Sequence, residues 1–346
     1  MAYLPNLIFF FLLTAGIGLF ARNFKRISRN IKLGKEVDRS DRPKLRLKTM
    51  LRVAFGQSKM VSRPVAGVLQ LLVYVGFVLI NIELLEIILD GFTGGHRIFA
   101  PFLGSVYNFL IASFEVLALL VLVAVILFWT RRNVMKIQRF WKPEMKGWPK
   151  KDADLILYFE VVLMVLFLSM NATDSLLQQA NIESYTKAGS FPISQYLLPL
   201  FADLSVETLL LLERSFWWAH IVGILIFLNY LYYSKHLHIL LAFPNTYYSN
   251  LEEKGKFEVN QHIKKEVQLM LNPEAVSEDS GETPPEKFGA TDVFDLNWVQ
   301  LMNAYSCTEC GRCSSVCPAN VTGKKLSPRA IMMKTRDRLE EVGKNL

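Results

Sequence analysis

Long apolar segments, separated by polar and mostly basic connections, dominate the first 245 residues of this chain. Each segment is close to the roughly 20 residues that a helix needs to cross the hydrocarbon core of a bilayer. Charged residues are sparse within the segments and frequent between them. The pattern predicts five membrane-spanning helices, over residues 4–21, 65–89, 107–129, 155–170 and 216–241.

A sixth apolar stretch, residues 193–212, differs from the others. Pro199, Asp203 and Glu207 interrupt it. Proline removes a backbone donor, and carboxylates are costly in lipid. We expect an interfacial or re-entrant helix here rather than another span.

Basic residues are concentrated in two connections. Residues 22–63 hold 14 Lys and Arg against three acids, and residues 131–154 hold eight Lys and Arg. The connections at 90–106 and 171–195 hold almost none. Because positively charged loops stay on the cytoplasmic side, we expect an external N-terminus and an internal C-terminus. The first span lacks a basic leader and a cleavage site, which indicates an uncleaved anchor.

Composition agrees with a membrane protein. The 346 residues are 51% hydrophobic, with a formal charge of +8 and a mean hydropathy of +0.25. We attribute the positive charge to cytoplasmic loops and expect a lipid membrane, not nucleic acid, as the partner. The sequence shows no internal repeat, no dinucleotide fingerprint and no phosphate-binding glycine loop.

The last hundred residues change character. Residues 250–271 have a mixed-charge helical pattern, and residues 273–290 are acidic and rich in Pro and Gly, as in a flexible linker. A short helix is expected over 295–305. Ser327 and Pro328 form a cap and first-turn signal for a helix through about Val342. The predicted domains are a membrane domain at 1–244, a soluble helix and linker at 245–294, and a small helical domain at 295–346.

All four cysteines of the chain lie within this last domain, in the order Cys307, Cys310, Cys313 and Cys317, followed by Pro318. The spacing C-x2-C-x2-C-x3-C-P is that of bacterial ferredoxins with [4Fe–4S] clusters. Zinc sites more often use two separated pairs or add histidine. We therefore predict an iron–sulfur cluster, with zinc or a disulfide pair as alternatives. Cysteines used in this way fit a reducing compartment.

The motif leaves one ligand unassigned. In two-cluster ferredoxins, the fourth cysteine of such a run binds the other cluster. Cys307, Cys310 and Cys313 would then need a ligand from elsewhere, and this chain has no further cysteine. We expect either a fragment of a longer protein or a partner that supplies the ligands. In the other alternative, Cys317 completes a single cluster.

Histidines mark the last predicted span. His220 and His238 are 18 residues apart, so a continuous helix would place them on one face, about 27 Å apart along the axis. Such a pair suits two haem b groups, with His96 as the partner of His220. Alternatively, Lys235, His236 and His238 are interfacial polar residues that reach water from a helix end.

Several acids also lie within apolar segments. Ionisable groups in a membrane often mark a proton or substrate path, and quinone chemistry couples electrons to protons. Alternatively, each acid pairs with a basic residue or with solvent near a helix end. These residues are Glu83, Glu86, Glu115 and Glu160, with Asn81.

The segments Trp217-Trp-Ala-His220, Tyr233-Ser-Lys-His236-Leu-His238 and Pro244-Asn245, followed by the cysteine run, carry a family resemblance. The chain resembles bacterial membrane-bound iron–sulfur oxidoreductases, which are related to heterodisulfide reductase and have a transmembrane domain like the nitrate reductase gamma subunit. The resemblance implies five helices with haem b, exchange with quinone, and a cytoplasmic domain with two [4Fe–4S] clusters. This chain departs from the family in having Gln70 where relatives often have histidine, no second cysteine run and no Cys-Cys-Gly module.

The sequence thus predicts a mainly α fold, in which a polytopic membrane bundle precedes a small α-helical ferredoxin-like [4Fe–4S] domain. Its predicted role is that of an oxidoreductase component in the bacterial cytoplasmic membrane, with the cysteines on the cytoplasmic side. Electrons would pass between a soluble redox partner, such as a flavoprotein, and quinone. The alternative is a non-catalytic, membrane-anchored iron–sulfur sensor or assembly subunit.

Overall fold

The computed structural model describes residues 3–60, 64–253, 255–256, 259, 261–272 and 289–346. Five of its helices are long and apolar enough to cross a membrane, as the hydropathy pattern predicted. Among the described residues there is no strand, and Lys35 and Asn297 form an isolated parallel bridge. The long helices are α1 (Leu4–Ile31), α3 (Pro64–Thr93), α5 (Ser105–Asn133), α6 (Trp148–Gln179) and α7 (Val206–Tyr230).

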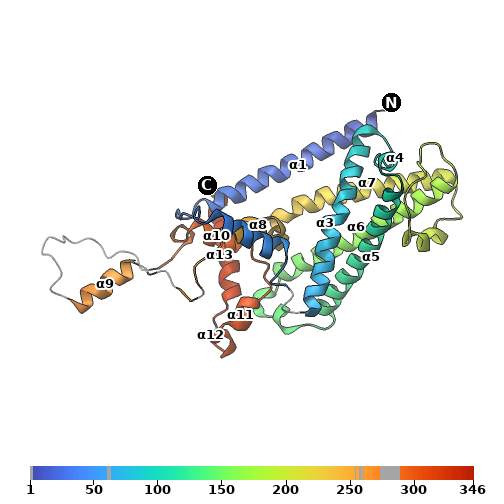
Figure 1. Ribbon diagram of the computed structural model, residues 1–346. Helices are drawn as coiled ribbons and strands as arrows, with labels where there is room; N and C mark the ends of the chain where they lie inside the picture. Colours follow the sequence, from blue (N-terminus) through green and yellow to red (C-terminus); the bar gives the residue numbers. More distant parts are fainter. Residues whose placement is uncertain (1–2, 61–63, 254, 257–258, 260, 273–288) are drawn as a thin grey trace.

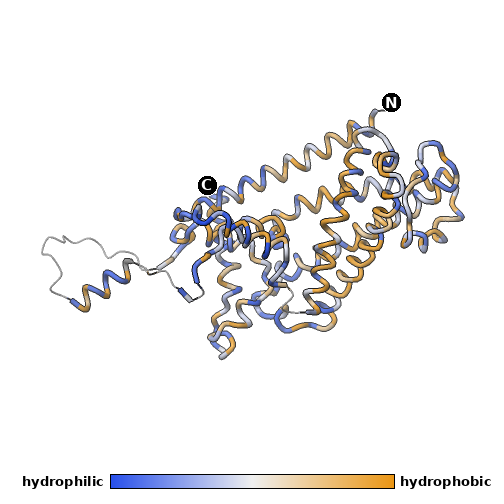
Figure 2. The backbone as a smooth tube through the Cα atoms, in the orientation of Figure 1, coloured by the Kyte–Doolittle hydropathy of each residue, from blue (hydrophilic) through white to orange (hydrophobic). Residues whose placement is uncertain are grey.

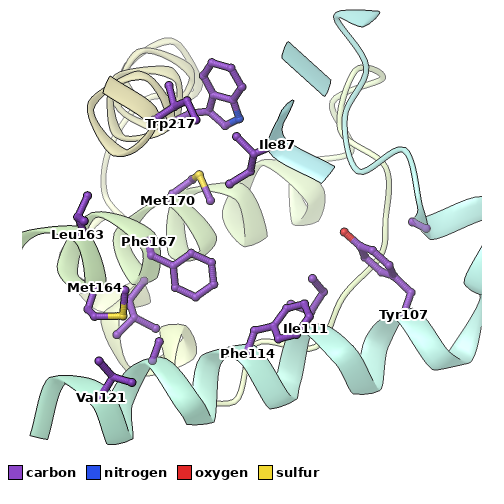
Figure 3. Packing of buried hydrophobic residues seen from close by; sticks show 14 of the residues in the cluster. Ile87, Tyr107, Ile111, Phe114, Val121, Leu163, Met164, Phe167, Met170 and Trp217 are labelled. Atoms are coloured by element: carbon purple, nitrogen blue, oxygen red, sulfur yellow. The ribbon is translucent and has the colours of Figure 1, made fainter. Parts of the chain in front are cut away.

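The five long helices pack into one bundle, in which α6 lies against α5 and α7, and α3 lies against α1 and α5 (Figure 1). Phe167 from α6 and Phe114 from α5 meet in the core, with Trp217 of α7 nearby (Figure 3). Large apolar side chains such as Phe77 and Ile126 remain exposed on the outside. Figure 2 shows this hydrophobic character along the long helices. A lipid environment explains such exposure, because apolar side chains there are not in water.

Most helices extend beyond their apolar segments. The fourth segment was expected to close at Asn171 and Asp174, yet α6 continues to Gln179 with both residues buried. Arg97 bonds to both side chains, so these polar groups are satisfied inside the bundle. Polar residues therefore end the apolar segment without ending the helix.

The prediction for residues 193–212 needs a correction. Residues Ser194–Leu200 form a short 3-10 helix, η4, that contains Pro199. Ser205 then caps α7 by accepting a hydrogen bond from the backbone N–H of Thr208. Residues 206–212 thus belong to the fifth long helix and not to a separate interfacial helix, because the serine cap starts the helix ahead of the apolar segment.

The fifth helix is also shorter at its other end than predicted. After Tyr230 the chain forms a 3-10 turn, and Ser234 is extended, with φ −109° and ψ 147°. A second 3-10 turn, Lys235–Leu237, leads into α8 (His238–Tyr247). The expectation that His220 and His238 share one helix face is wrong, because it assumed an unbroken helix.

The C-terminal segment packs directly against the membrane bundle. Its helices are α10 (Trp298–Tyr305), α11 (Arg312–Val316), α12 (Pro318–Val321) and α13 (Pro328–Lys344). Leu301 and Leu339 share a hydrophobic cluster with Ile27 of α1 and Phe227 of α7. The C-terminus accordingly lies beside the end of α1 (Figure 1).

The junction between the two regions requires a glycine. A Cβ atom at Gly34 would lie 2.6 Å from the backbone nitrogen of Trp298. The backbone N–H of Lys35 donates to the carbonyl of Leu296 at this point, and the Trp298 indole donates to the carbonyl of Val37. Only a residue without a side chain allows the two backbones to approach so closely.

The predicted helices after residue 245 differ in how closely the structure matches them. Ser327 accepts the N–H of Ala330 and caps α13, as predicted. The predicted helix over 295–305 begins at Trp298, and the helical pattern over 250–271 yields α9 (Gln261–Leu271). The predicted linker at 273–290 lies outside the described residues, apart from its last two positions.

Candidate functional site

The four cysteines lie on a loop that follows α10 and continues through α11. Glu309 and Gly311 have positive φ angles of 54° and 72°. These turns reverse the backbone between successive cysteines, and the N–H of Glu309 points at the Cys307 sulfur, 3.4 Å away. Backbone N–H groups that face sulfur stabilise thiolates and are one of the features that set cluster potentials. We call residues 307–317 the cysteine loop.

The donor set of the cysteine loop suits iron–sulfur chemistry. All four thiols are free of disulfides, and Cys313 is exposed. Within the described residues, no group of three or more His, Cys, Asp or Glu side chains is arranged to hold a metal ion. The loop therefore has the soft ligands and the turns, whereas its sulfurs are not gathered around one point. Cluster ligation by Cys307, Cys310, Cys313 and Cys317 remains a prediction.

The protein environment acts differently on the two leading thiols. Burial raises the pKa of the Cys307 thiol. Burial acts in the same direction at Cys310, but hydrogen bonds from Thr308 and from the backbone of Arg312, with the charges of Arg312 and Arg139, leave its pKa below the usual value. Positive charge at this end of the loop favours thiolate, the form that binds metal.

A buried ion pair holds the cysteine loop against the break in the fifth helix. The ammonium of Lys235 bonds to the carboxylate of Glu309, which also accepts a hydrogen bond from Arg336 at 2.8 Å. Lys235 donates a second bond to the carbonyl of Pro149 at 2.6 Å. Burial would raise the pKa of Glu309, but Lys235 and Arg336 outweigh it and lower that pKa. We call Lys235, Glu309 and Arg336 the loop clamp.

The break itself is fixed by Asp152 near the start of α6. Its carboxylate accepts the backbone N–H of Lys235 at 3.0 Å and the Tyr230 hydroxyl at 2.6 Å. Asp152 thus satisfies backbone that would be unpaired where the helix stops. The loop clamp consequently rests on a helix end that is held in place by a second helix.

Arg329 anchors the other side of the cysteine loop. Its buried guanidinium bonds to Glu144 at 2.7 Å and to the carbonyl of Arg139 at 2.7 Å, both in the α5–α6 connection. A Cβ at Gly311 would lie 2.6 Å from its Nη1. Neither the Arg329–Glu144 contact nor the loop clamp is predicted by the sequence pattern. A charged residue between two predicted ligands, such as Glu309, was the available signal.

His236 and His238 lie at the helix break. Their ring centroids are 5.4 Å apart, and His238 Nδ1 is 3.0 Å from the carbonyl of Lys235. Because Lys235 also bonds to Glu309, the two imidazoles lie on the same turn that holds the cysteine loop. These contacts connect the loop to the end of the membrane bundle.

His220 lies deeper in the bundle and is buried. Its Nδ1 is 3.1 Å from the carbonyl of Leu163, an arrangement that favours the proton on Nδ1 and leaves Nε2 as an acceptor. His220 lines a cavity of about 100 Å³ between α3, α5, α6 and α7, together with Glu83 and Glu160. Most of the lining is hydrophobic, so we call it the apolar cavity. Several of its wall residues, including Leu163, Met164 and Phe167, appear in Figure 3.

His96 lies elsewhere, on a larger cavity of about 380 Å³. Its Nε2 is 3.1 Å from Asp174, and its Nδ1 accepts the backbone N–H of Thr186. Both ring nitrogens are therefore engaged. Because Glu86, Asp90, Arg97, Glu213 and Arg214 also line this space, we call it the polar cavity.

The geometry bears on the predicted haem. His96 and His220 line different cavities, and the apolar cavity is much smaller than the roughly 300–1,000 Å³ of typical ligand pockets. A haem does not fit that space in this conformation. It is closer to the cavity of about 150 Å³ that holds a single benzene ring. Haem ligation by His220, His238 and His96 stays a prediction.

Comparisons with known proteins identify relatives along the chain. No protein family profile matches it, and no solved structure is significantly similar. A probable iron-sulfur-binding oxidoreductase, FadF, of Bacillus subtilis is 28% identical over 341 residues, covering 98% of this chain and 44% of that protein. An EtfAB:quinone oxidoreductase of Syntrophomonas wolfei is 25% identical over 306 residues, covering 86% of this chain and 38% of that protein.

A shorter match concerns a probable membrane-anchored ferredoxin of Chromohalobacter salexigens. It is 34% identical over 58 residues, which are 17% of this chain and 8% of that protein. The chain spans less than half the length of each of these curated relatives.

Proposed function

We propose that this chain is the membrane part of an iron–sulfur oxidoreductase that passes electrons between a soluble flavoprotein and quinone. The names of the three relatives support an iron–sulfur oxidoreductase, and one of them names both a flavoprotein and quinone. The five long apolar helices support a membrane location. The bacterial cytoplasmic membrane, with the cysteine loop on the cytoplasmic side, follows from the distribution of basic residues.

One observation carries the proposal: the loop clamp holds the cysteine loop against the end of the helix that contains His220. From His220 to Tyr230, the last residue of α7, there are ten residues, or about 15 Å of helix. A redox group at the cysteine loop would therefore lie near the end of the same helix that reaches the apolar cavity. Such an arrangement suits electron transfer between a soluble domain and a ligand in the membrane.

An iron–sulfur cluster, when bound, supplies one-electron transfer at the cysteine loop. Cys307, Cys310 and Cys313 would hold one [4Fe–4S] cluster, and Cys317 would either complete it or bind a second cluster. The N–H of Glu309 and the charges of Arg139 and Arg312 favour the thiolates. The loop clamp fixes the distance from the cysteine loop to the membrane bundle.

The apolar cavity is our candidate site for the quinone ring. Its wall combines hydrophobic side chains with His220 and two carboxyls. The Nε2 of His220, which the bond from Nδ1 to the Leu163 carbonyl leaves as an acceptor, would accept a hydrogen bond from a quinol hydroxyl. Haem b at His220 is the competing occupant, and it would need a wider space.

The test uses the full-length protein, purified without oxygen. A naphthoquinol analogue should reduce the cluster, so that visible absorbance bleaches and a low-temperature EPR signal appears. A pyridine haemochrome assay on the same sample counts haem. If the cluster absorbance changes with neither the quinol nor a flavoprotein donor, the chain is better explained as a membrane-anchored sensor. Protein that contains neither iron nor sulfide would overturn the proposal.

A further inference from the structure

Glu83 of α3 lines both the polar cavity and the apolar cavity. It is buried, and its Oε2 has no hydrogen-bond partner among the described residues. A buried carboxyl oxygen without a partner is costly, because it has lost its hydrogen bonds to water and gained none within the protein. A carboxyl group that lies between two cavities and has a free oxygen is well suited to bind and release a proton.

The neighbouring buried acids differ from Glu83 because other residues hold them. Glu86 accepts the Tyr107 hydroxyl at 2.6 Å and the N–H of Phe99 at 2.9 Å. The carboxylate of Asp174 accepts a hydrogen bond from Nε of Arg97 at 2.7 Å. These bonds hold both carboxylates in place.

Two further buried acids are held in the same way. Glu115 accepts the backbone N–H groups of Ile193 and Ser194, and Glu213 accepts the Tyr185 hydroxyl at 2.7 Å. These four buried acids therefore have protein partners at their carboxylates. Glu83, in contrast, has an unpartnered oxygen at the boundary between the two cavities.

The helix provides a series of carboxyls that leads away from Glu83. Glu83, Glu86 and Asp90 are spaced by three and four residues on α3, and all three line the polar cavity. This spacing places them on one helix face, at successive rises of about 4.5 and 6 Å. Asp90 is near the end of the helix, at Thr93. Protons could thus pass between the end of the bundle and Glu83.

On the apolar side, Glu83 shares the cavity wall with His220 and Glu160. Arg97 also lines the polar cavity, and its positive charge acts on Glu83 together with the charges of Glu86, Glu115 and Asp174. These groups from α3, α5, α6, α7 and the connection after α3 set the electrostatic environment of the Glu83 carboxyl.

We propose that Glu83 transfers protons between a quinone ring in the apolar cavity and the polar cavity. This inference rests on the proposed function. When a quinol is oxidised, it loses two electrons and two protons. The electrons pass one at a time to the cluster at the cysteine loop, and onward to the soluble partner. Each proton binds the Glu83 carboxylate and leaves through the polar cavity, which restores the carboxylate for the next proton. Quinone reduction follows the same steps in reverse.

The experiment compares Glu83→Gln with Glu83→Asp and Glu183→Gln in the full-length protein. Glutamine keeps the size of the side chain but cannot carry a proton. Glu183 is exposed in the connection after α6, at the polar-cavity end, and is a matched carboxyl-to-amide control. The assay follows cluster reduction by a naphthoquinol analogue from pH 6 to pH 9, together with redox-difference infrared spectra in the carboxyl region.

Glu83→Gln should lower the maximal rate about a hundredfold, with a KM near that of the wild type, and should remove a carboxyl band from the difference spectrum. Glu83→Asp should keep a shifted band and recover part of the rate, with an altered pH profile. Glu183→Gln should match the wild type. A change in KM alone would indicate a structural role and would overturn the inference.

The two proposals fail in different ways. If the wild-type cluster does not respond to the quinol, the proposed function fails, and the role of Glu83 fails with it. If the wild type responds and Glu83→Gln has the same rate, pH profile and infrared spectrum, only the inference on Glu83 is overturned. If Glu83→Gln does not fold, Glu83→Asp decides by its infrared band and pH profile.

Discussion

Lys235 and Glu309 form an ion pair across the junction between the membrane bundle and the cysteine loop, with side chains only 9% and 2% exposed. Lys235 lies at the break in the fifth helix, and Glu309 lies between Cys307 and Cys310. Neither residue is near the other in sequence. The pair therefore ties the position of a predicted redox loop to the end of a membrane helix.

Removing one partner of this pair should destabilise the protein strongly. Lys235→Met leaves a buried carboxylate with Arg336 alone, and losing one member of a buried pair costs about 3–5 kcal/mol. The double variant Lys235→Met, Glu309→Gln should be more stable than the sum of the single changes predicts. Unfolding in detergent by denaturant measures each variant.

An exposed pair provides the control for this cycle. Lys256 and Glu252 form an i,i+4 ion pair with side chains 65% and 37% exposed. Lys256→Met should change the free energy of unfolding by about 0–1 kcal/mol. Equal effects of Lys235→Met and Lys256→Met would contradict the importance we assign to the loop clamp.

The cysteine loop should bind iron through its thiols. Cys310→Ser should lose the EPR signal and most of the iron and acid-labile sulfide, because a hydroxyl is a much poorer ligand for the cluster than a thiolate. Ser315→Ala, a similarly small change on α11, should keep the full iron content. Metal analysis of anaerobic preparations decides, and zinc in place of iron would refute the assignment.

Gly311 should resist substitution for two reasons. A non-glycine residue at φ +72° costs about 1–2 kcal/mol, and a Cβ there would also contact Arg329. Gly323 has φ +87° but open space around its Cβ position. Gly323→Ala should therefore cost less than Gly311→Ala in thermal unfolding, and it should keep the cluster content. If both substitutions lower the unfolding temperature equally, the side chain of Arg329 must move away from the new Cβ without loss of stability.

The contact between Glu144 and Arg329 should make stability depend on pH. Burial opposes ionisation of Glu144, but the bond from Arg329 outweighs it and lowers the pKa below the usual 4.5. A carboxyl whose pKa is lowered on folding stabilises the protein above its unfolded pKa, and the gain is lost as the pH falls below that value. The denaturation midpoint of the wild type should thus exceed that of Glu144→Gln at pH 7, and the gap should narrow below pH 4.5. A gap that stays constant with pH would exclude this ion pair as its cause.

The sequence predicts those features that depend only on neighbouring residues. The five spans follow from the length of their apolar runs, and the start of α13 follows from Ser327 and Pro328, because each needs only neighbouring residues. Helix boundaries also depend on partners from elsewhere in the chain. The polar residues Asn171 and Asp174 predict an end of the fourth span, whereas their partner Arg97 lets the helix continue.

What the sequence determined by itself is a chain of five lipid-compatible helices followed by four closely spaced thiols. Hydropathy and ligand spacing are properties of short windows, so they can be read without coordinates. The tertiary structure decided the break at Ser234, the docking of Glu309 on Lys235, and the position of Glu83 between two cavities. These features depend on residues far apart in the chain that meet only when the helices pack, and no local pattern encodes that meeting.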